Sequence, residues 1–258
     1  METAFLEKVR KLNWVLMEST TGSLSYNDIS RILSETINAN LYIMDINGVV
    51  LGVSYTNIED TSAFFDELGV NKIPEEDNRH FIAISETRAN LVGTELVPIL
   101  GENYSMRDKY HMIVPCSCGG QRLGTILAAR YTDSFVDEDI ALCEIGATVI
   151  GLEIQRNIEA NRTNERNRIL ACEMAFDTLS FSERIAISKI FDDFEGEEAS
   201  IVASKIAEKY GLTNSIIVSA LKKFESAGVL EAKSLGMKGT SIRIVNPYIR
   251  ETIKNAKI

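Results

Sequence analysis

Residues 200–245 constrain the fold of this chain most, and they read SIVASKIAEKYGLTNSIIVSALKKFESAGVLEAKSLGMKGTSIRIV. Apolar residues recur at a spacing of three and four on both sides of Gly211, which indicates two short helices separated by a sharp turn. Thr213 is placed to cap the second helix. The runs VLEAK and SIRIV then read as two strands joined by a glycine-containing turn. Helix, turn, helix and two-stranded wing is the order of a winged helix-turn-helix.

The second predicted helix has two contrasting sides. Its apolar stripe consists of Ile217, Ala220, Leu221 and Phe224. Its opposite side offers hydroxyl and ammonium groups, which bond base edges and phosphates, and an apolar valine that suits a thymine methyl group. We therefore expect this helix to enter the major groove of double-stranded DNA. The DNA contacts predicted for the two helices and the wing are Lys205, Lys209, Thr213, Asn214, Ser215, Val218, Ser219, Lys222, Lys223, Lys233 and Lys238.

Charge is distributed unevenly along the chain. Residues 203–258 contain ten Lys/Arg and four Asp/Glu, whereas the whole chain has a formal charge of −10. A basic segment attached to an acidic body is the electrostatic pattern of a DNA-binding module. The alternative, a plain helical hairpin with a solvated polar face, does not require this imbalance.

Length and composition narrow the class of protein. A chain of 258 residues with 45% apolar content suits two globular domains. It contains no run of about eighteen apolar residues and begins without a signal-peptide core, so we expect a cytoplasmic protein with no membrane span. The four cysteines and two histidines lack zinc-site spacing, and the sequence has neither a P-loop nor a nucleophile-and-base motif. We therefore expect no metal site and no enzymatic activity.

The N-terminal part reads as helices flanking an antiparallel sheet. Helices are expected at 3–19, 25–39 and 62–70, and strands at 41–46, 49–54, 80–85, 95–100, 110–118 and 123–131. Asn47-Gly48 predicts a tight hairpin between the first two strands, because both residues tolerate positive φ. The run GGQR predicts a second hairpin turn. This pattern is typical of a GAF- or PAS-like sensor domain, whose sheet encloses a small-molecule pocket.

From Ser134 the pattern is helical to about Leu179. Its middle, QRNIEANRTNERNR, is nearly all polar and indicates an exposed spacer, since apolar residues are too sparse there for a coiled-coil seam. Ser180 and Glu183 form a capping box that opens the next helix. The predicted fold is therefore α+β. It has a GAF-like effector-binding domain over residues 1–154, a helical linker over 155–179 and a winged helix-turn-helix over 180–258.

Several segments resemble the CodY family of global transcriptional regulators of Gram-positive bacteria. They are ASKIAEKYGLT, ESAGVLEAKSLGMKGT, GGQRLGTIL and EIGATVIGLEI, and they lie in both domains in the family's order. The resemblance implies a homodimer or tetramer that mainly represses nutrient-scavenging, biosynthetic and virulence genes by binding AT-rich pseudo-palindromes. It also implies that branched-chain amino acids, chiefly isoleucine, bind the GAF pocket and that GTP is a second effector, both of which raise DNA affinity.

The expected effector pocket departs from the family pattern at one position. The resemblance places the effector-binding residues at Ala63, Phe64, Ile73, Pro74, Val97, Pro98 and Ile99. In the family, an arginine that binds the carboxylate of the amino acid stands where this chain has Ala63. A carboxylate removed from water needs a partner. Backbone N–H groups, Lys72, Arg79 and Arg88 are the alternatives for that role.

A different effector is the competing interpretation of the sensor domain. The same DNA-binding domain can be joined to a sensor for another metabolite or for thiol oxidation. Cys116 and Cys118 have C-x-C spacing within a strand-like run, so both thiols are expected to face the same side. A DNA-bridging protein with no effector is a third possibility.

Overall fold

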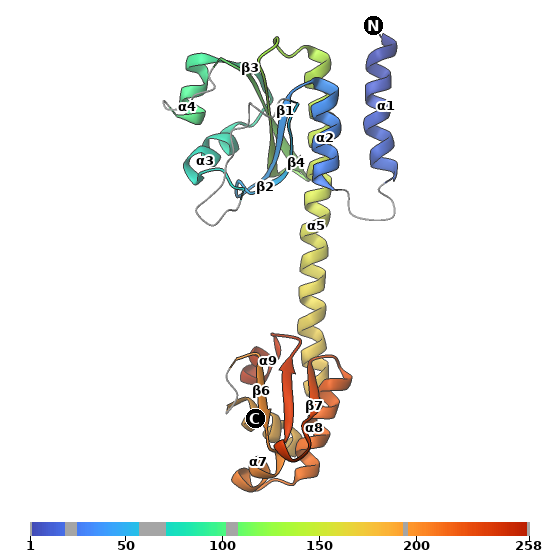
Figure 1. The fold of residues 1–258 in the computed structure, drawn as a ribbon, viewed down its shortest axis with the longest axis vertical. Helices are drawn as coiled ribbons and strands as arrows, with labels where there is room; N and C mark the ends of the chain where they lie inside the picture. The colour runs from blue at the N-terminus through green and yellow to red at the C-terminus, as the bar shows by residue number, and fades with distance from the viewer. Residues whose placement is uncertain (1, 19–24, 57–70, 102–107, 193–195, 257–258) are drawn as a thin grey trace. The chain divides into compact units, whose positions relative to one another are not determined.

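The structure is a computed structural model that describes residues 2–18, 25–56, 71–101, 108–192 and 196–256 (Figure 1). The chain forms two compact units, Met1–Ile158 and Glu159–Ile258. Each unit has its own hydrophobic core. The first is built on an antiparallel sheet and the second on a helix-turn-helix with a small sheet, and one long helix runs through the boundary. The predicted α+β fold is thus confirmed.

The sheet of the first unit has five antiparallel strands. They are β1 (Asn40–Asp45), β2 (Val50–Ser54), β3 (Arg88–Leu91), β4 (Tyr110–Cys118) and β5 (Gln121–Arg130), in the spatial order β2-β1-β5-β4-β3. The Asn47-Gly48 turn joins β1 and β2 as predicted, with Gly48 at φ +80°. The Asp45 carboxylate accepts the backbone N–H groups of Asn47 and Val49, both at 2.8 Å. A glycine pair at positive φ closes the β4–β5 hairpin, also as predicted.

Helices cover one face of this sheet. They are α2 (Tyr26–Ile37) and the first part of α5 (Asp137–Asp177), and α1 (Glu2–Glu18) packs against α2 (Figure 1). Their apolar side chains share one core with β1, β4 and β5. A Cβ at Gly151 of α5 would lie 2.7 Å from the carbonyl oxygen of Ser117. A glycine is therefore needed where α5 approaches the β4 backbone.

Short helices and loops cover the opposite face. They are α3 (Glu75–Ala83), the 3₁₀ helix η3 (Gly93–Leu96) and α4 (Val97–Leu100). A second core lies between them and the sheet, and its buried members include Tyr42, Met44, Phe81, Leu96 and Ile113. In a GAF-like domain this is the face on which an effector is expected, so the site residues predicted there are located below.

Two predicted strands on this face are wrong. Residues 80–85 belong mainly to α3, and residues 95–100 form η3 and α4. Pro74 at the N-cap and three acidic residues in the first turn favour a helix at α3, because negative charge is stabilised at a helix N-terminus. Apolar runs this short do not distinguish a strand from a buried helical turn. The strand β3 was not predicted, and the predicted helix at 62–70 lies outside the described residues.

The second unit has the predicted order of helix, turn, helix and wing. Its helices are α6 (Phe181–Asp192), α7 (Ala203–Tyr210), α8 (Asn214–Ser226) and α9 (Ile249–Asn255), and its strands are β6 (Glu198–Ile201), β7 (Leu230–Ser234) and β8 (Thr240–Ile244). The sheet order is β6-β8-β7, and η4 (Gly236–Lys238) lies in the turn between the two wing strands. The two helices and the two wing strands are confirmed. Strand β6 and helix α9 were not predicted.

Helix α5 is continuous from Asp137 to Asp177. Residues 159–168 are exposed, as expected for a polar spacer. Near its C-terminal end, Cys172, Ala175 and Phe176 are buried in the core of the second unit. The linker limits of 155–179 stay a prediction. None of the described helices has the length and apolar content needed to cross a membrane.

Candidate nucleic-acid interface

Helices α7 and α8 are positioned by a sharp turn and by their buried faces. Gly211 ends α7 in the left-handed conformation at φ +66°, where glycine is unstrained. The apolar stripe predicted for α8 is buried, since its four members are at most 4% exposed. Thr213 occupies the N-cap position of α8 without a capping side-chain bond, so the predicted cap is wrong. Its hydroxyl instead lies 3.0 Å from the hydroxyl of Ser215.

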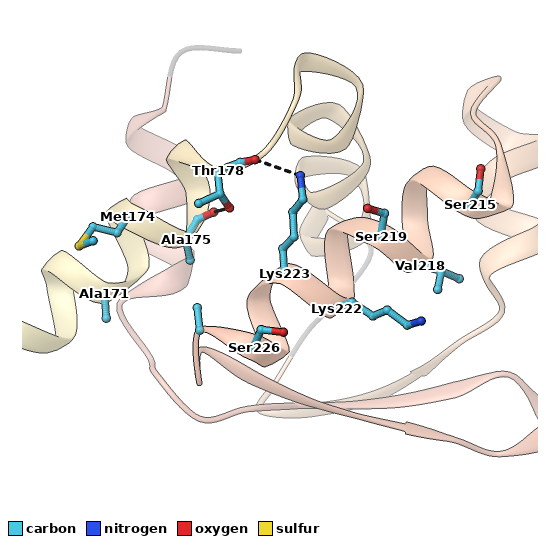
Figure 2. Close-up of a pocket in the computed structure, with 11 residues that line it drawn as sticks. Ala171, Met174, Ala175, Thr178, Ser215, Val218, Ser219, Lys222, Lys223 and Ser226 are labelled. Atoms are coloured by element: carbon cyan, nitrogen blue, oxygen red, sulfur yellow. Dashed lines mark hydrogen bonds between the residues drawn. The ribbon is translucent and has the colours of Figure 1, made fainter.

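The exposed face of α8 is divided into two parts. Ser215, Val218 and Lys222 are exposed, and Val218 is 39% exposed despite being apolar. Ser219 and Lys223 are only partly exposed, because both donate hydrogen bonds to Glu183 of α6. Figure 2 shows Lys223 extending toward Thr178 while Lys222 extends in another direction. Only part of the predicted DNA-facing set therefore lies free toward solvent.

Glu183 is the centre of a hydrogen-bonded cluster. Its carboxylate accepts Ser219 Oγ at 2.7 Å, Lys223 Nζ at 2.7 Å and the backbone N–H of Ser180 at 2.7 Å. The Glu183 backbone N–H is 3.4 Å from Ser180 Oγ, so the predicted capping box is confirmed. The pKa of Glu183 is lowered to about 2, mainly by the hydrogen bond from Lys223 and to a smaller extent by that from Ser219. The carboxylate is therefore ionised at neutral pH.

A groove runs beside α8 on this side. It has a volume of about 910 Å³ and is lined by Ala171, Met174, Ala175, Thr178, Ser215, Val218, Ser219, Lys222, Lys223, Ser226 and Ala227 (Figure 2). Small side chains from the end of α5 face those of α8, and Met174 is 61% exposed. The solvent-facing side of α8 thus combines hydroxyl, ammonium and apolar groups.

The wing and α7 carry further exposed cations. Lys233 of β7, Lys238 of the wing turn, and Lys205 and Lys209 of α7 are exposed, and so is the neutral Asn214 at the start of α8. A Cβ at Gly239 would overlap the Ile201 carbonyl oxygen, so this turn requires glycine. Arg243 of β8 is paired with Glu231 of β7 at 2.7 Å. DNA contact by the predicted residues stays a prediction.

The predicted effector residues are spread over several elements. Ala63 and Phe64 lie outside the described residues. Ile73 and Ile99 are buried in the second core of the first unit. Pro74 is the N-cap residue of α3, and Val97 and Pro98 open α4.

One groove brings part of this set together with a cation. It has a volume of about 500 Å³ and is lined by His80, Ala83, Ile84, Ser85, Glu86, Thr87, Arg88, Pro98 and Ile99. Of the three cations considered for the carboxylate, Arg88 lines it, and Lys72 and Arg79 do not. The groove is thus lined by apolar residues predicted for the effector together with a guanidinium group.

Arg122, which is partly buried, and His111, which is buried, have structural roles in the first unit. Arg122 donates hydrogen bonds to the carbonyl oxygens of Gly124 at 2.6 Å and Ile84 at 2.7 Å, which ties β5 to the end of α3. His111 is fully buried on β4, and its Nδ1 lies 2.9 Å from the Lys109 carbonyl oxygen. Burial lowers the pKa of His111 to about 4, so the imidazole is neutral at pH 7.

Three of the four cysteines are buried, and burial makes a thiol less reactive. Burial raises the pKa of the Cys116 thiol to about 12 and that of the Cys172 thiol to about 11. The thiolate is the reactive form, so these groups are nearly inert near neutral pH. Cys118 is partly exposed, and none of the four cysteines forms a disulfide. Among the described residues, no group of three or more His, Cys, Asp or Glu side chains is placed to bind a metal ion.

The chain matches two family models, that of the CodY GAF-like domain over residues 4–178 and that of the CodY helix-turn-helix domain over residues 197–257. The global transcriptional regulator CodY of Caldanaerobacter subterraneus subsp. tengcongensis is 42% identical to it over 254 residues, which are 98% of each chain. The corresponding regulator of Clostridium acetobutylicum is 40% identical over 254 residues, again 98% of each chain. The solved cofactor-binding GAF domain of the nutrient sensor CodY from Clostridium difficile has 36% identity and a TM-score of 0.48, over 58% of this chain and 96% of that chain.

Proposed function

The chain belongs to the CodY family of global transcriptional regulators, and from this premise we propose that it is mainly a repressor that binds AT-rich pseudo-palindromic DNA as a homodimer or tetramer. Its DNA affinity rises when isoleucine, or another branched-chain amino acid, binds the GAF-like unit, and GTP acts as a second effector. It works in the cytoplasm and couples nutrient supply to the expression of metabolic and virulence genes.

The exposed side of α8 is the observation that carries the DNA-binding proposal. Its buried stripe fixes which side faces outward, and that side presents Ser215, Val218 and Lys222. A helix of this kind fits the major groove with its N-terminal residues near base edges. Exposed lysines on α7 and the wing lie in the same compact unit, where they are available for phosphates on either side of the groove.

Fluorescence anisotropy with the full-length chain tests this proposal. The ligands are a duplex that the protein selects from a random pool and a scrambled duplex of the same base composition. We expect the selected duplex to bind at least a thousandfold more tightly near physiological salt, as is usual for specific regulators. Equal affinity for both duplexes at every salt concentration would remove sequence-specific regulation as the function.

The sensor proposal rests on the apolar face of the first unit and on Arg88. Isoleucine needs an apolar surface for its side chain and a cation or N–H groups for its carboxylate. Pro98, Ile99 and Arg88 line one groove, so we favour Arg88 for the carboxylate.

Calorimetric titration of the full-length chain with isoleucine tests the effector and the role of Arg88 together. Arg88→Ala should weaken binding at least tenfold, whereas Arg79→Ala, an exposed cation on α3, should leave it unchanged. The absence of binding heat for the unmodified protein, together with unchanged DNA affinity, would exclude isoleucine. Intact binding by the Arg88 variant would exclude only the assigned cation.

A further inference from the structure

Helix α8, which we propose enters the major groove, is hydrogen-bonded on one side to the carboxylate of Glu183. Ser219 and Lys223 are four residues apart and therefore lie on the same side of the helix. Both donate to Glu183, whose side chain is only 8% exposed. Lys223 Nζ also donates to the carbonyl oxygen of Thr178 at 3.0 Å (Figure 2). Helix α8 is thus tied to the first turn of α6 and to the residue that follows α5.

These bonds limit rotation of α8 about its own axis. The buried stripe alone tolerates small rotations, because apolar packing has no fixed direction. Two hydrogen bonds from one side of α8 to a single buried carboxylate are directional, and charged partners strengthen them. Because Glu183 also closes the capping box of α6, its own position is fixed by Ser180. The carboxylate therefore defines the angle at which the exposed side of α8 is presented.

The same bonds remove one cation from the set available to DNA. Lys223 is 37% exposed, and its ammonium group lies 2.7 Å from a carboxylate that is ionised at neutral pH. For this lysine to reach a phosphate, it would have to leave the buried carboxylate without its charged partner, which is costly. Lys222, the next residue, has no such partner among the described residues.

We propose that Glu183 is a positioning residue for DNA recognition, which fixes the rotation of α8 and withholds Lys223 from the phosphates so that Ser215, Val218 and Lys222 form the reading surface. This inference rests on the proposed DNA-binding function. It assigns Lys223 a role inside the protein, although sequence alone places it among the DNA contacts.

Glu183→Gln tests the proposal because it removes the charge and keeps the size of the side chain. Affinities are measured for the selected and the scrambled duplex from 50 to 300 mM salt. We expect the preference for the selected duplex to fall at least tenfold, because α8 loses its fixed angle. The salt slope should become steeper by about 0.9, the value for one added phosphate contact, because Lys223 is released.

Two further variants separate positioning from a loss of structure. Asp192→Asn is the matched control, since Asp192 also lies on α6 in an ion pair, with Lys189 at 3.0 Å, but on an exposed surface. It should leave the preference and the salt slope unchanged. The double variant Glu183→Gln with Lys223→Gln should return the salt slope to the wild-type value while the preference stays low.

The outcomes distinguish this inference from the proposed function. If the wild-type chain shows no preference between the duplexes, DNA recognition itself is wrong. If the wild type shows a preference and Glu183→Gln keeps both that preference and the salt slope, the positioning role is wrong. If Glu183→Gln binds both duplexes more weakly by the same factor, with an unchanged salt slope, its role is purely structural and the positioning role is also wrong. If Glu183→Gln does not fold, Ser219→Ala, which keeps the ion pair and the capping box, must lower the preference at an unchanged slope.

Discussion

Lys222 and Lys223 are adjacent lysines, and we predict that removing the first changes DNA binding whereas removing the second changes the stability of the fold. Lys222 is exposed on α8 and has no hydrogen-bond or ion-pair partner within the part of the chain that the structure describes. Lys223 is bonded to Glu183 at 2.7 Å. Lys222→Ala should therefore remove a phosphate contact, whereas Lys223→Ala should leave the number of phosphate contacts unchanged and destabilise the fold.

The magnitude for Lys222 follows from counterion release. One phosphate contact contributes about 0.9 to the slope of log affinity against log salt concentration, so a fourfold rise in salt weakens each contact about 3.5-fold. Between 50 and 200 mM salt, the loss of affinity of Lys222→Ala should thus be about 3.5-fold smaller than that of the wild type. For Lys223→Ala, the loss of the charged hydrogen bond to Glu183 should lower the free energy of unfolding by about 1.5–3 kcal/mol, since Ser219 and Ser180 still donate to the carboxylate.

Anisotropy titrations with the selected duplex at four salt concentrations measure the slopes, and urea unfolding measures the stabilities. Lys254→Ala is the matched control, because Lys254 is an exposed lysine of the same unit, on α9, outside the predicted DNA-binding set. It should change neither quantity. Equal changes in slope for the Lys222 and Lys223 variants would refute the reasoning, because both side chains would then contact phosphates.

Three further predictions concern stability. Asp139→Ala should lower the free energy of unfolding by about 3–5 kcal/mol, because it removes a buried ion-pair partner of Arg130 at 2.8 Å. Asp133→Ala removes an exposed partner of the same arginine and should cost under about 1 kcal/mol. Urea unfolding measures both. Burial keeps His111 neutral in the folded state, so its contribution to the free energy of unfolding should be fully present above its unfolded pKa of about 6.5. This free energy should fall by about 2–3 kcal/mol between pH 7 and pH 4.5. Unfolding curves at the two pH values should show a smaller loss for His111→Gln. Phe224→Ala should cost about 3–5 kcal/mol, because the ring is fully buried, and thermal unfolding should show a loss well above that of an exposed substitution.

The sequence predicted most about the second unit, because its local signals agree with its tertiary packing. The apolar spacing of α8, Gly211 after α7 and the two wing strands all point to the same arrangement, and the structure has each of them. The capping box of Ser180 and Glu183 was also visible. Strand β6 escaped prediction because its four residues, at the edge of the sheet, are too few to give a periodic signal.

The first unit was harder to predict where helices and strands share the same composition. Residues 80–85 and 95–100 are short segments rich in apolar residues, and a run of this length does not separate a helical turn from a strand. Pro74 was predicted as an effector-binding residue, and its position as the N-cap residue of α3 was not predicted. Burial from the sheet side then decides the conformation, and that information is not local. The hairpins at Asn47-Gly48 and at the β4–β5 turn were predictable because positive φ depends on the residue itself.

The residues on the exposed side of α8 were predictable, but which of its lysines faces solvent and which bonds to Glu183 was not. A helical wheel places Ser219 and Lys223 on the side of α8 that carries Ser215, yet it contains no information on the neighbouring helix. Glu183 precedes Lys223 by 40 residues in the sequence, and no spacing rule connects them. Its role in the capping box was the one available signal, and it concerned α6 alone. Long-range pairing of a buried carboxylate therefore has to be read from the structure.

The packing of α5 limits how an effector can act on DNA affinity. Cys172, Ala175 and Phe176, near the end of α5, share one core with α8, and Lys223 bonds to Thr178 directly after that helix. A rotation of α8 relative to the end of α5 would have to break the hydrogen bonds of Ser219 and Lys223 to Glu183. Hydrogen bonds to a charged group contribute about 1.5–3 kcal/mol each, so breaking them would consume the roughly 1–3 kcal/mol of a typical allosteric coupling. We therefore expect the proposed effector to change the placement of whole DNA-binding units in the proposed oligomer and to leave the internal geometry of each unit intact.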